Sequence, residues 1–174
     1  MQTTGLGINL QSMSLEEAQK FSTEVAASVR DCFATITDFD SYPSWSSAVQ
    51  DISVLERHHD GLARLVEFHV DMTIKTVRYV LEYDYEGPEA LRWHSVDGDL
   101  ELIEGAYTFE KLKAKQTMAT CQQAVAIGFW VPGPILRMME RTALQQSVLE
   151  FKREAEARTR RARTPGRVRK RPGR

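Results

Sequence analysis

Residues 78–86 read Arg-Tyr-Val-Leu-Glu-Tyr-Asp-Tyr-Glu, and the alternation within them indicates the class of fold. Aromatic or aliphatic side chains at 79, 81, 83 and 85 alternate with charged ones at 78, 82, 84 and 86. A period of two residues is typical of an antiparallel β-strand that buries one face and exposes the other. The chain on either side should therefore supply the neighbouring strands of a sheet.

The same period runs through most of the chain between residues 49 and 127. Asp60-Gly61 and Asp97-Gly98 are hairpin signals that divide it. Gly105 stands inside one of the resulting stretches, where it predicts a bulge or a sharp bend. The predicted strands cover Val54-Leu55 and then 62–71, 76–86, 90–96, 100–112 and 116–127.

Helices are predicted on both sides of this region. A short strand over 21–28 precedes a helix over 29–37, for which Ser28 is a good N-cap, and Pro43 suits the start of a second short helix. After Pro132-Gly133-Pro134 a long helix should run over about 135–158. One face of that helix repeats apolar side chains at Leu144, Val148, Phe151 and Ala155.

The order of elements predicts an α+β fold. It consists of a bent antiparallel sheet of about seven strands wrapped around a long C-terminal helix, with two short helices after the first strand. A bent sheet does not touch a straight helix everywhere, so we expect space for a ligand between them. Such ligand cavities usually measure a few hundred Å³.

The stretch 38–45, Asp-Phe-Asp-Ser-Tyr-Pro-Ser-Trp, resembles the D-x-x-x-Y-P-x-W segment of START-like helix-grip proteins. These are the polyketide cyclase/dehydrase and coenzyme-Q-binding proteins of the SRPBCC group. The stretches 79–83, 105–109 and 131–133 are similar to later parts of such proteins, and the resemblance covers about 20–157. It implies a helix-grip fold with a hydrophobic ligand, and it extends to lipid and quinone carriers, aromatase/cyclases and ribosome-associated proteins.

Aromatic side chains are the first candidates to line a ligand pocket, because Tyr and Trp combine an apolar body with one polar tip. The alternative is ordinary packing in the core. Arg137 and Glu140, with Arg141, begin the long helix near the expected pocket mouth, or else form a solvated surface pair. The aromatic candidates are Trp45, Tyr79, Tyr83, Trp93, Tyr107, Phe109 and Trp130.

Neither a metal site nor a cofactor is predicted. The four histidines lack zinc-ligand spacing, and there is no phosphate-cradling Gly-rich loop. Cys32 and Cys121 are expected to be buried small hydrophobic residues rather than ligands or a disulfide. The histidines are His58, His59, His69 and His94.

Catalytic residues are not identified by any motif. Glu67, Glu101 and Glu104 lie on predicted strands, and any of them that faced inward would be a candidate acid or base with a raised pKa. The alternative places all three on the polar outer face of the sheet.

Charge divides the chain into an acidic body and a basic end. Residues 158–174 hold nine basic and no acidic residues; subtracting them from 23 basic and 24 acidic residues leaves 14 against 24, a net charge of −10 for 1–157. We expect a flexible extension over 1–19, the folded domain over 20–157 and a disordered tail over 158–174. The tail could contact RNA or an anionic membrane, or simply be solvated.

These features favour a protein that binds or carries a hydrophobic small molecule such as a lipid, a quinone or a polycyclic compound. An aromatase/cyclase or dehydratase acting on a polyketide chain is the first alternative. An interaction protein associated with RNA or the ribosome is the second. The sequence shows neither a signal peptide nor an apolar run of ~20 residues, so we expect a cytoplasmic protein without a transmembrane segment.

Overall fold

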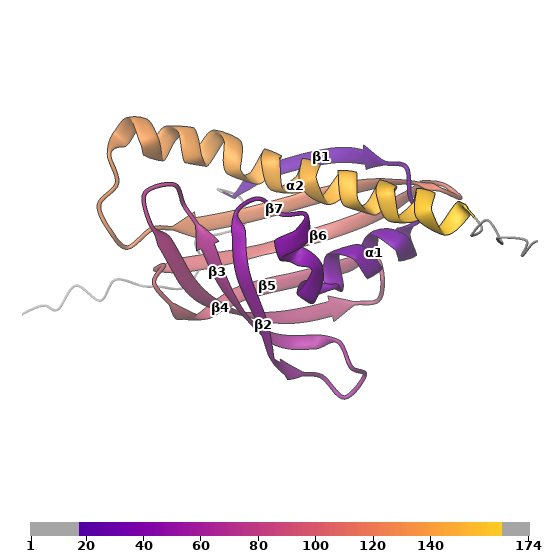
Figure 1. Ribbon diagram of the computed structural model, residues 1–174, viewed down its shortest axis with the longest axis horizontal. Helices are drawn as coiled ribbons and strands as arrows, with labels where there is room; N and C mark the ends of the chain where they lie inside the picture. The colour runs from indigo at the N-terminus through magenta and orange to yellow at the C-terminus, as the bar shows by residue number, and fades with distance from the viewer. Residues whose placement is uncertain (1–17, 165–174) are drawn as a thin grey trace, which may run out of the picture.

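The computed structural model describes residues 18–164, and its seven strands form one antiparallel sheet in the order β1-β7-β6-β5-β4-β3-β2 (Figure 1). The long helix α2 lies along one side of this sheet with the short helices α1 and η2 beside it. The predicted fold class is confirmed. The elements are β1 (Gln19–Val25), α1 (Val29–Thr37), η2 (Phe39–Ser44), β2 (Val49–Arg57), β3 (Ala63–Asp71), β4 (Thr76–Glu86), β5 (Ala90–Gly98), β6 (Leu102–Lys113), β7 (Gln116–Ala126) and α2 (Gly133–Arg163).

The predicted apolar face of α2 is the face that the helix buries. Leu144, Val148, Phe151 and Ala155 are all buried in the main core cluster. Their spacing of three or four residues keeps them on one side of the helix, where they pack toward β1, β7 and α1. This packing fixes the second half of α2 on the sheet.

Helix α1 begins at the predicted N-cap. The Ser28 hydroxyl accepts a hydrogen bond from the Asp31 backbone N–H at 3.1 Å, and the Asp31 carboxylate accepts one from the Ser28 N–H at 3.4 Å. This reciprocal capping box satisfies backbone donors that the first turn of a helix otherwise leaves free.

Two local predictions need correction. The second short helix is a 3₁₀ helix that begins at Phe39, so Pro43 lies inside it rather than at its start. Gly105 causes no bulge, because its pairing with Trp93 on β5 and with Gln123 on β7 is in regular register.

The C-terminal boundary also differs from the prediction, since α2 continues to Arg163 instead of ending near 158. Arg158 belongs to the folded body: its guanidinium donates to the Asp38 carboxylate at 2.8 Å and to the Glu154 carboxylate at 2.7 Å. These bonds tie the last turns of α2 to the connection between α1 and η2. The basic end is therefore partly built into the domain.

Most of the predicted N-terminal extension and the last part of the basic tail, residues 1–17 and 165–174, lie outside the described residues. The contacts expected of the tail with RNA or a membrane stay predictions. Within residues 18–164, neither α1 nor α2 has the length and apolar character that a membrane crossing requires.

Candidate functional site

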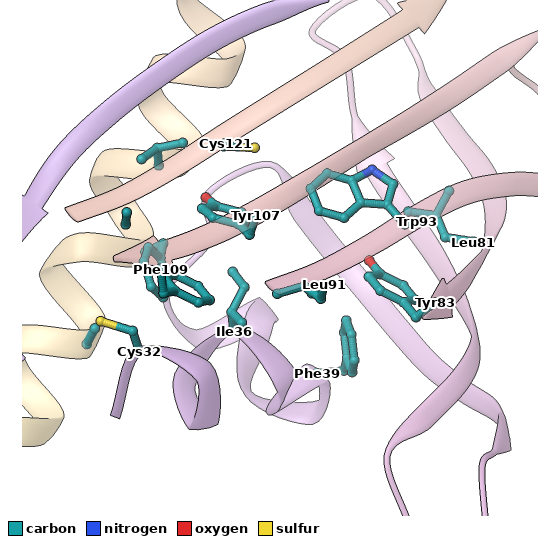
Figure 2. Packing of buried hydrophobic residues seen from close by; sticks show 14 of the residues in the cluster. Cys32, Ile36, Phe39, Leu81, Tyr83, Leu91, Trp93, Tyr107, Phe109 and Cys121 are labelled. Atoms are coloured by element: carbon teal, nitrogen blue, oxygen red, sulfur yellow. The ribbon is translucent and has the colours of Figure 1, made fainter. Parts of the chain in front are cut away.

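Aromatic rings from three adjacent strands form a row on the inner face of the sheet, the face turned toward α1 and α2 (Figure 2). The ring centroids of Tyr83 on β4 and Trp93 on β5 are 6.1 Å apart, and those of Trp93 and Tyr107 on β6 are 6.0 Å apart. Phe109 continues the row at 5.6 Å from Tyr107. The structure therefore brings four of the predicted site residues into one cluster.

Gly105 makes this row possible because it leaves room for the Trp93 indole. A Cβ atom at Gly105 would lie 2.5 Å from the Trp93 ring and 2.7 Å from the Gln122 carbonyl oxygen. Gly105 and Trp93 are directly paired across β5 and β6, so the indole lies over the glycine backbone. The glycine is required by the close approach of the Trp93 side chain.

The helices cover this row with further aromatic rings. Phe39 from η2 lies 4.8 Å from Tyr83 between centroids, and Phe151 from α2 lies 5.5 Å from Tyr107. Phe68 stacks on Tyr79 at 5.4 Å, which extends the cluster to β3. The sequence analysis did not include Phe39 or Phe68 among the candidate site residues. Phe68 lies on a predicted strand, and Phe39 lies just after the predicted first helix.

The close packing of these rings differs from the predicted ligand cavity of a few hundred Å³ lined by the aromatic candidates. One pocket of ≈ 440 Å³ lies on the surface of α2 around Gln146 and Leu149, and a second of ≈ 310 Å³ lies at the end of α2. Neither is lined by any of the predicted site residues. The aromatic rings of the sheet contact one another and the rings Phe39 and Phe151 of the covering helices.

Two buried polar groups in the cluster are nevertheless unsatisfied. The Trp93 Nε1–H and the Tyr107 hydroxyl have no hydrogen-bond partner among residues 18–164. The Tyr107 hydroxyl lies beside the Cys121 thiol and the Ser147 side chain without bonding to either in normal geometry. An unpaired buried donor costs about 1–3 kcal/mol, so these two groups mark a place where a hydrogen-bond acceptor would stabilise the protein.

Two other tyrosines, Tyr42 on η2 and Tyr85 on β4, have hydroxyls that are satisfied by a backbone carbonyl. Tyr42 donates to the Ile36 carbonyl at 2.6 Å, and Tyr85 donates to the Ala63 carbonyl at 2.7 Å. Burial raises the pKa of Tyr83 and Tyr107 well above the ordinary value, so both remain neutral donors at physiological pH.

The remaining predicted site residues lie elsewhere. Trp45 packs at the edge of the cluster, 4.5 Å from Tyr42 between centroids, and donates from its indole to the Ser41 hydroxyl at 3.0 Å. Trp130 does not line the site: it is 83% exposed, because the loop before α2 turns its neighbour Val131 inward instead. Arg137 and Glu140 lie on α2, but their side chains are outside what the structure describes.

The candidate carboxylates do not face the cluster. Glu67 pairs with Arg78 at 2.6 Å on the outer face of the sheet, and Glu104 alternates with the buried Ile103 and Gly105 and so points outward. Glu101 is exposed at the turn before β6. None of the three is placed to act as an acid or base on a molecule in the interior.

Two of the four histidines lie next to carboxylates on the outer face of the sheet. His94 lies 3.5 Å from a Glu82 carboxylate oxygen, and His69 lies 3.9 Å from carboxylate oxygens of Asp51 and Glu67. Across residues 18–164, no group of three or more metal-ligating side chains is found. These two histidines therefore lie beside carboxylates on the outer face of the sheet.

Both cysteines are buried thiols, as predicted. Burial raises the pKa of Cys32 to about 11 and that of Cys121 to about 12. At neutral pH both are protonated and are poor nucleophiles.

A buried carboxylate that sequence reasoning missed holds α2 against the rest of the domain. Glu150, which is 6% exposed, accepts hydrogen bonds from the Ser47 N–H at 3.0 Å and from the Ser47 hydroxyl at 2.6 Å. Gln146 donates to the same carboxylate at 3.1 Å. Because Ser47 connects η2 to β2, this network anchors the middle of α2 over the aromatic cluster.

Residues 25–152 match the family described as polyketide cyclase/dehydrase and lipid transport, and the chain belongs to this family. No curated protein matches the sequence. The family assignment confirms the resemblance seen in the sequence and fits the helix-grip architecture described above.

Solved structures of the same architecture are distant in sequence. A START superfamily protein from Mycobacterium smegmatis superposes with a TM-score of 0.73 at 20% identity, over 80% of this chain and 97% of that one. The Zhui aromatase/cyclase from Streptomyces sp. R1128 gives 0.70 at 18% identity, over 85% and 98%. TTHA0849 from Thermus thermophilus gives 0.69 at 18% identity, over 84% and 99%. At these identities the likeness shows the fold.

Proposed function

We propose that the protein binds or carries a neutral hydrophobic molecule that bears hydrogen-bond acceptors, such as a quinone or another polycyclic carbonyl compound. The observation that carries this proposal is the pair of unsatisfied donors, Trp93 Nε1 and Tyr107 Oη, within an otherwise apolar aromatic cluster. A carbonyl oxygen of a ligand would satisfy each donor. The rings around them supply the apolar contact.

Electrostatics favours a neutral ligand over an ionised one. The polar groups offered by the cluster are phenols and an indole, and the raised pKa of Tyr107 keeps its hydroxyl protonated. A carboxylate or phosphate without a cation in this interior would suffer a large desolvation penalty. The expected ligand therefore has carbonyl or ether oxygens and no charge.

Binding requires an opened form of the domain, because the rings are in contact in the closed form. The contacts that have to separate are those between the sheet and the covering rings Phe39 and Phe151, whose centroids lie 4.8 Å from Tyr83 and 5.5 Å from Tyr107. A ligand that binds the opened form better shifts the population toward it.

An aromatase/cyclase is the alternative, supported by the structural likeness to the Zhui enzyme. Cyclisation or dehydration of a polyketide needs a general acid or base beside the substrate. Glu67 and Glu104 lie on the outer face of the sheet and Glu101 lies at a turn, so none of these carboxylates is beside the aromatic cluster. Their positions favour a protein that binds its ligand without catalysing a reaction. Neutral tyrosine hydroxyls remain the groups that such an enzyme would use as acids.

A matched pair of probes tests the binding proposal. Duroquinone and durene share one ring with four methyl groups, and only duroquinone carries carbonyl oxygens. We expect duroquinone to bind about tenfold more tightly, because it satisfies a buried donor. Tyr107→Phe should reduce this preference several-fold while leaving the affinity for durene nearly unchanged, because it removes only the hydroxyl.

Tyr85→Phe is the matched control, because the Tyr85 hydroxyl already donates to the Ala63 carbonyl. It should leave the preference for duroquinone unchanged. Equal affinity for the two probes in the unaltered protein would contradict the role of the donors. Failure of both probes to bind, together with no molecule retained in native mass spectrometry of the purified protein, would contradict hydrophobic binding altogether.

A further inference from the structure

The pocket of ≈ 310 Å³ at the end of α2 is separate from the aromatic cluster and has a different chemistry. It lies where the last turns of α2, the first turns of α1 and the β6–β7 turn come together. Three cationic side chains and one acidic side chain line it, so its lining carries a net charge of +2 (+3 − 1). The lining residues are Asp31, Ala34, Thr35, Lys115, Arg158, Thr159, Ala162 and Arg163.

The Thr159 hydroxyl is the unusual group in this pocket. It is buried, with the residue 7% exposed, and it has no hydrogen-bond partner among residues 18–164. Threonine hydroxyls within helices commonly donate to the carbonyl four residues earlier. Thr35, Thr37 and Thr142 all do so, at 2.8, 2.7 and 2.7 Å. Thr159 is the exception, so the hydrogen-bonding capacity of its hydroxyl is not used by any residue that the structure describes.

Two of the three cations are likewise uncommitted. Lys115 and Arg163 form no ion pair with any residue that the structure describes, and both are exposed at the rim. Arg158 is already held by Asp38, Glu154 and the Ser41 hydroxyl, and so it forms a fixed wall. Asp31 is held by Ser28 in the helix cap.

We propose that this pocket binds a phosphate monoester group through Lys115, Arg163 and the Thr159 hydroxyl. A phosphate monoester carries a charge of about −1.5 to −2 near pH 7 and has three strong acceptor oxygens. That charge is opposite in sign and similar in size to the net charge of +2 of the pocket lining, whereas a phosphodiester of a nucleic acid carries a single charge. The small side chains of Ala34 and Ala162 leave space beside the phosphate for the rest of the molecule.

Titration calorimetry at low salt with inorganic phosphate and glycerol phosphate tests this site. Lys115→Gln and Arg163→Gln should each weaken binding about tenfold, because each removes one charge-assisted contact. Thr159→Val should weaken it about fivefold and leave the melting temperature unchanged or higher, since it removes an unsatisfied buried hydroxyl. A merely structural threonine would lower the melting temperature instead.

Lys113→Gln and Arg160→Gln are the matched controls, because both residues are close in sequence to the pocket but do not line it. They should change the affinity less than twofold. Vesicles containing phosphatidic acid distinguish a lipid headgroup from a soluble monoester: tight vesicle binding that Thr159→Val weakens supports the site with a lipid as its source.

Three results would overturn the proposal. The first is no saturable binding of either soluble phosphate or the vesicles. The second is an equal loss in the control variants, which would indicate unspecific attraction. The third is binding of single-stranded RNA that Thr159→Val does not change, with no binding of glycerol phosphate, which would make the basic end a nucleic-acid surface.

Discussion

The inner and outer faces of the sheet alternate along the same strands but are stabilised in different ways. On the inner face the rings of Tyr83, Trp93 and Tyr107 pack on one another and on Phe151. On the outer face, ion pairs link neighbouring strands. Arg64 on β3 bonds to Glu56 on β2 and to Glu82 on β4, and Arg78 on β4 bonds to Glu67 on β3 and Asp97 on β5.

The difference shows that the inner face provides both most of the packing and the candidate binding site. Burial of apolar surface is the dominant favourable contribution to folding, while exposed ion pairs contribute about 0–1 kcal/mol each. The inner face also tolerates two unsatisfied donors, Trp93 Nε1 and Tyr107 Oη, within its packing. A packed face that retains such donors is the better candidate for a binding site.

The largest expected effect is alkaline unfolding driven by the inner face. Burial raises the pKa of all five tyrosines, so the unfolded chain ionises near pH 10 while the folded chain does not. The stabilisation that the neutral buried phenols provide is fully present below about pH 10. Above that pH the free energy of unfolding falls by ~1.4 kcal/mol per pH unit for each buried phenol, until the pH reaches the pKa of the folded state. Phenolate absorbance and circular dichroism should therefore change together. Phenolate formation near pH 10 in a still-folded protein would contradict this.

Phe151→Ala should give the next largest effect. Phe151 is fully buried against Tyr107 and Phe109, and removal of its ring should lower the free energy of unfolding by about 3–5 kcal/mol. Urea denaturation measures this change. Gln145→Ala on the exposed side of α2 is the control, with a change within ~0.5 kcal/mol. A loss below about 1 kcal/mol for Phe151→Ala would indicate that α2 is not docked as described.

Gly105→Ala should have an intermediate effect on the same face. The added Cβ would meet the Trp93 ring at 2.5 Å, and overpacking of this kind costs about 1–3 kcal/mol. Trp fluorescence should shift as the indole moves. Gly128→Ala is the matched control, since the nearest atom to its added Cβ is 3.4 Å away. Equal melting temperatures for the two variants would show that Trp93 does not lie over Gly105.

The smallest expected effect comes from the outer face. The hydrogen bond from Arg78 lowers the pKa of Asp97, so the stability from this pair is present above the ordinary aspartate pKa and is lost as the pH falls through the lowered value. Arg78→Gln should return the Asp97 pKa toward its ordinary value, as measured by NMR titration. The melting temperature at neutral pH should change little. A large loss of stability would mean that the ion-pair face contributes more than exposed pairs usually do.

Part of the site could be predicted because it follows from local pattern. Tyr83, Trp93 and Tyr107 lie on predicted strands, in which successive side chains alternate between the two faces. Because large aromatic side chains tend to be buried, these three were expected on the inner face. Trp130 shows the limit of this reasoning, because a loop residue has no periodicity and its orientation depends on how Val131 packs. The closed state of the cluster depends on Phe39 and Phe151, which approach from helices distant in sequence.

The sequence by itself determined the elements of this protein: the two-residue period of the strands, the Ser28 cap, the buried face of α2 and the family. These are local properties, because periodicity and capping depend on residues only a few positions apart. Tertiary structure alone determined which groups meet. The approach of Trp93 to Gly105, the docking of Arg158 on Asp38 and the unpaired buried hydroxyl of Thr159 depend on strand register and on where α2 lies. No spacing along the chain encodes those long-range relations.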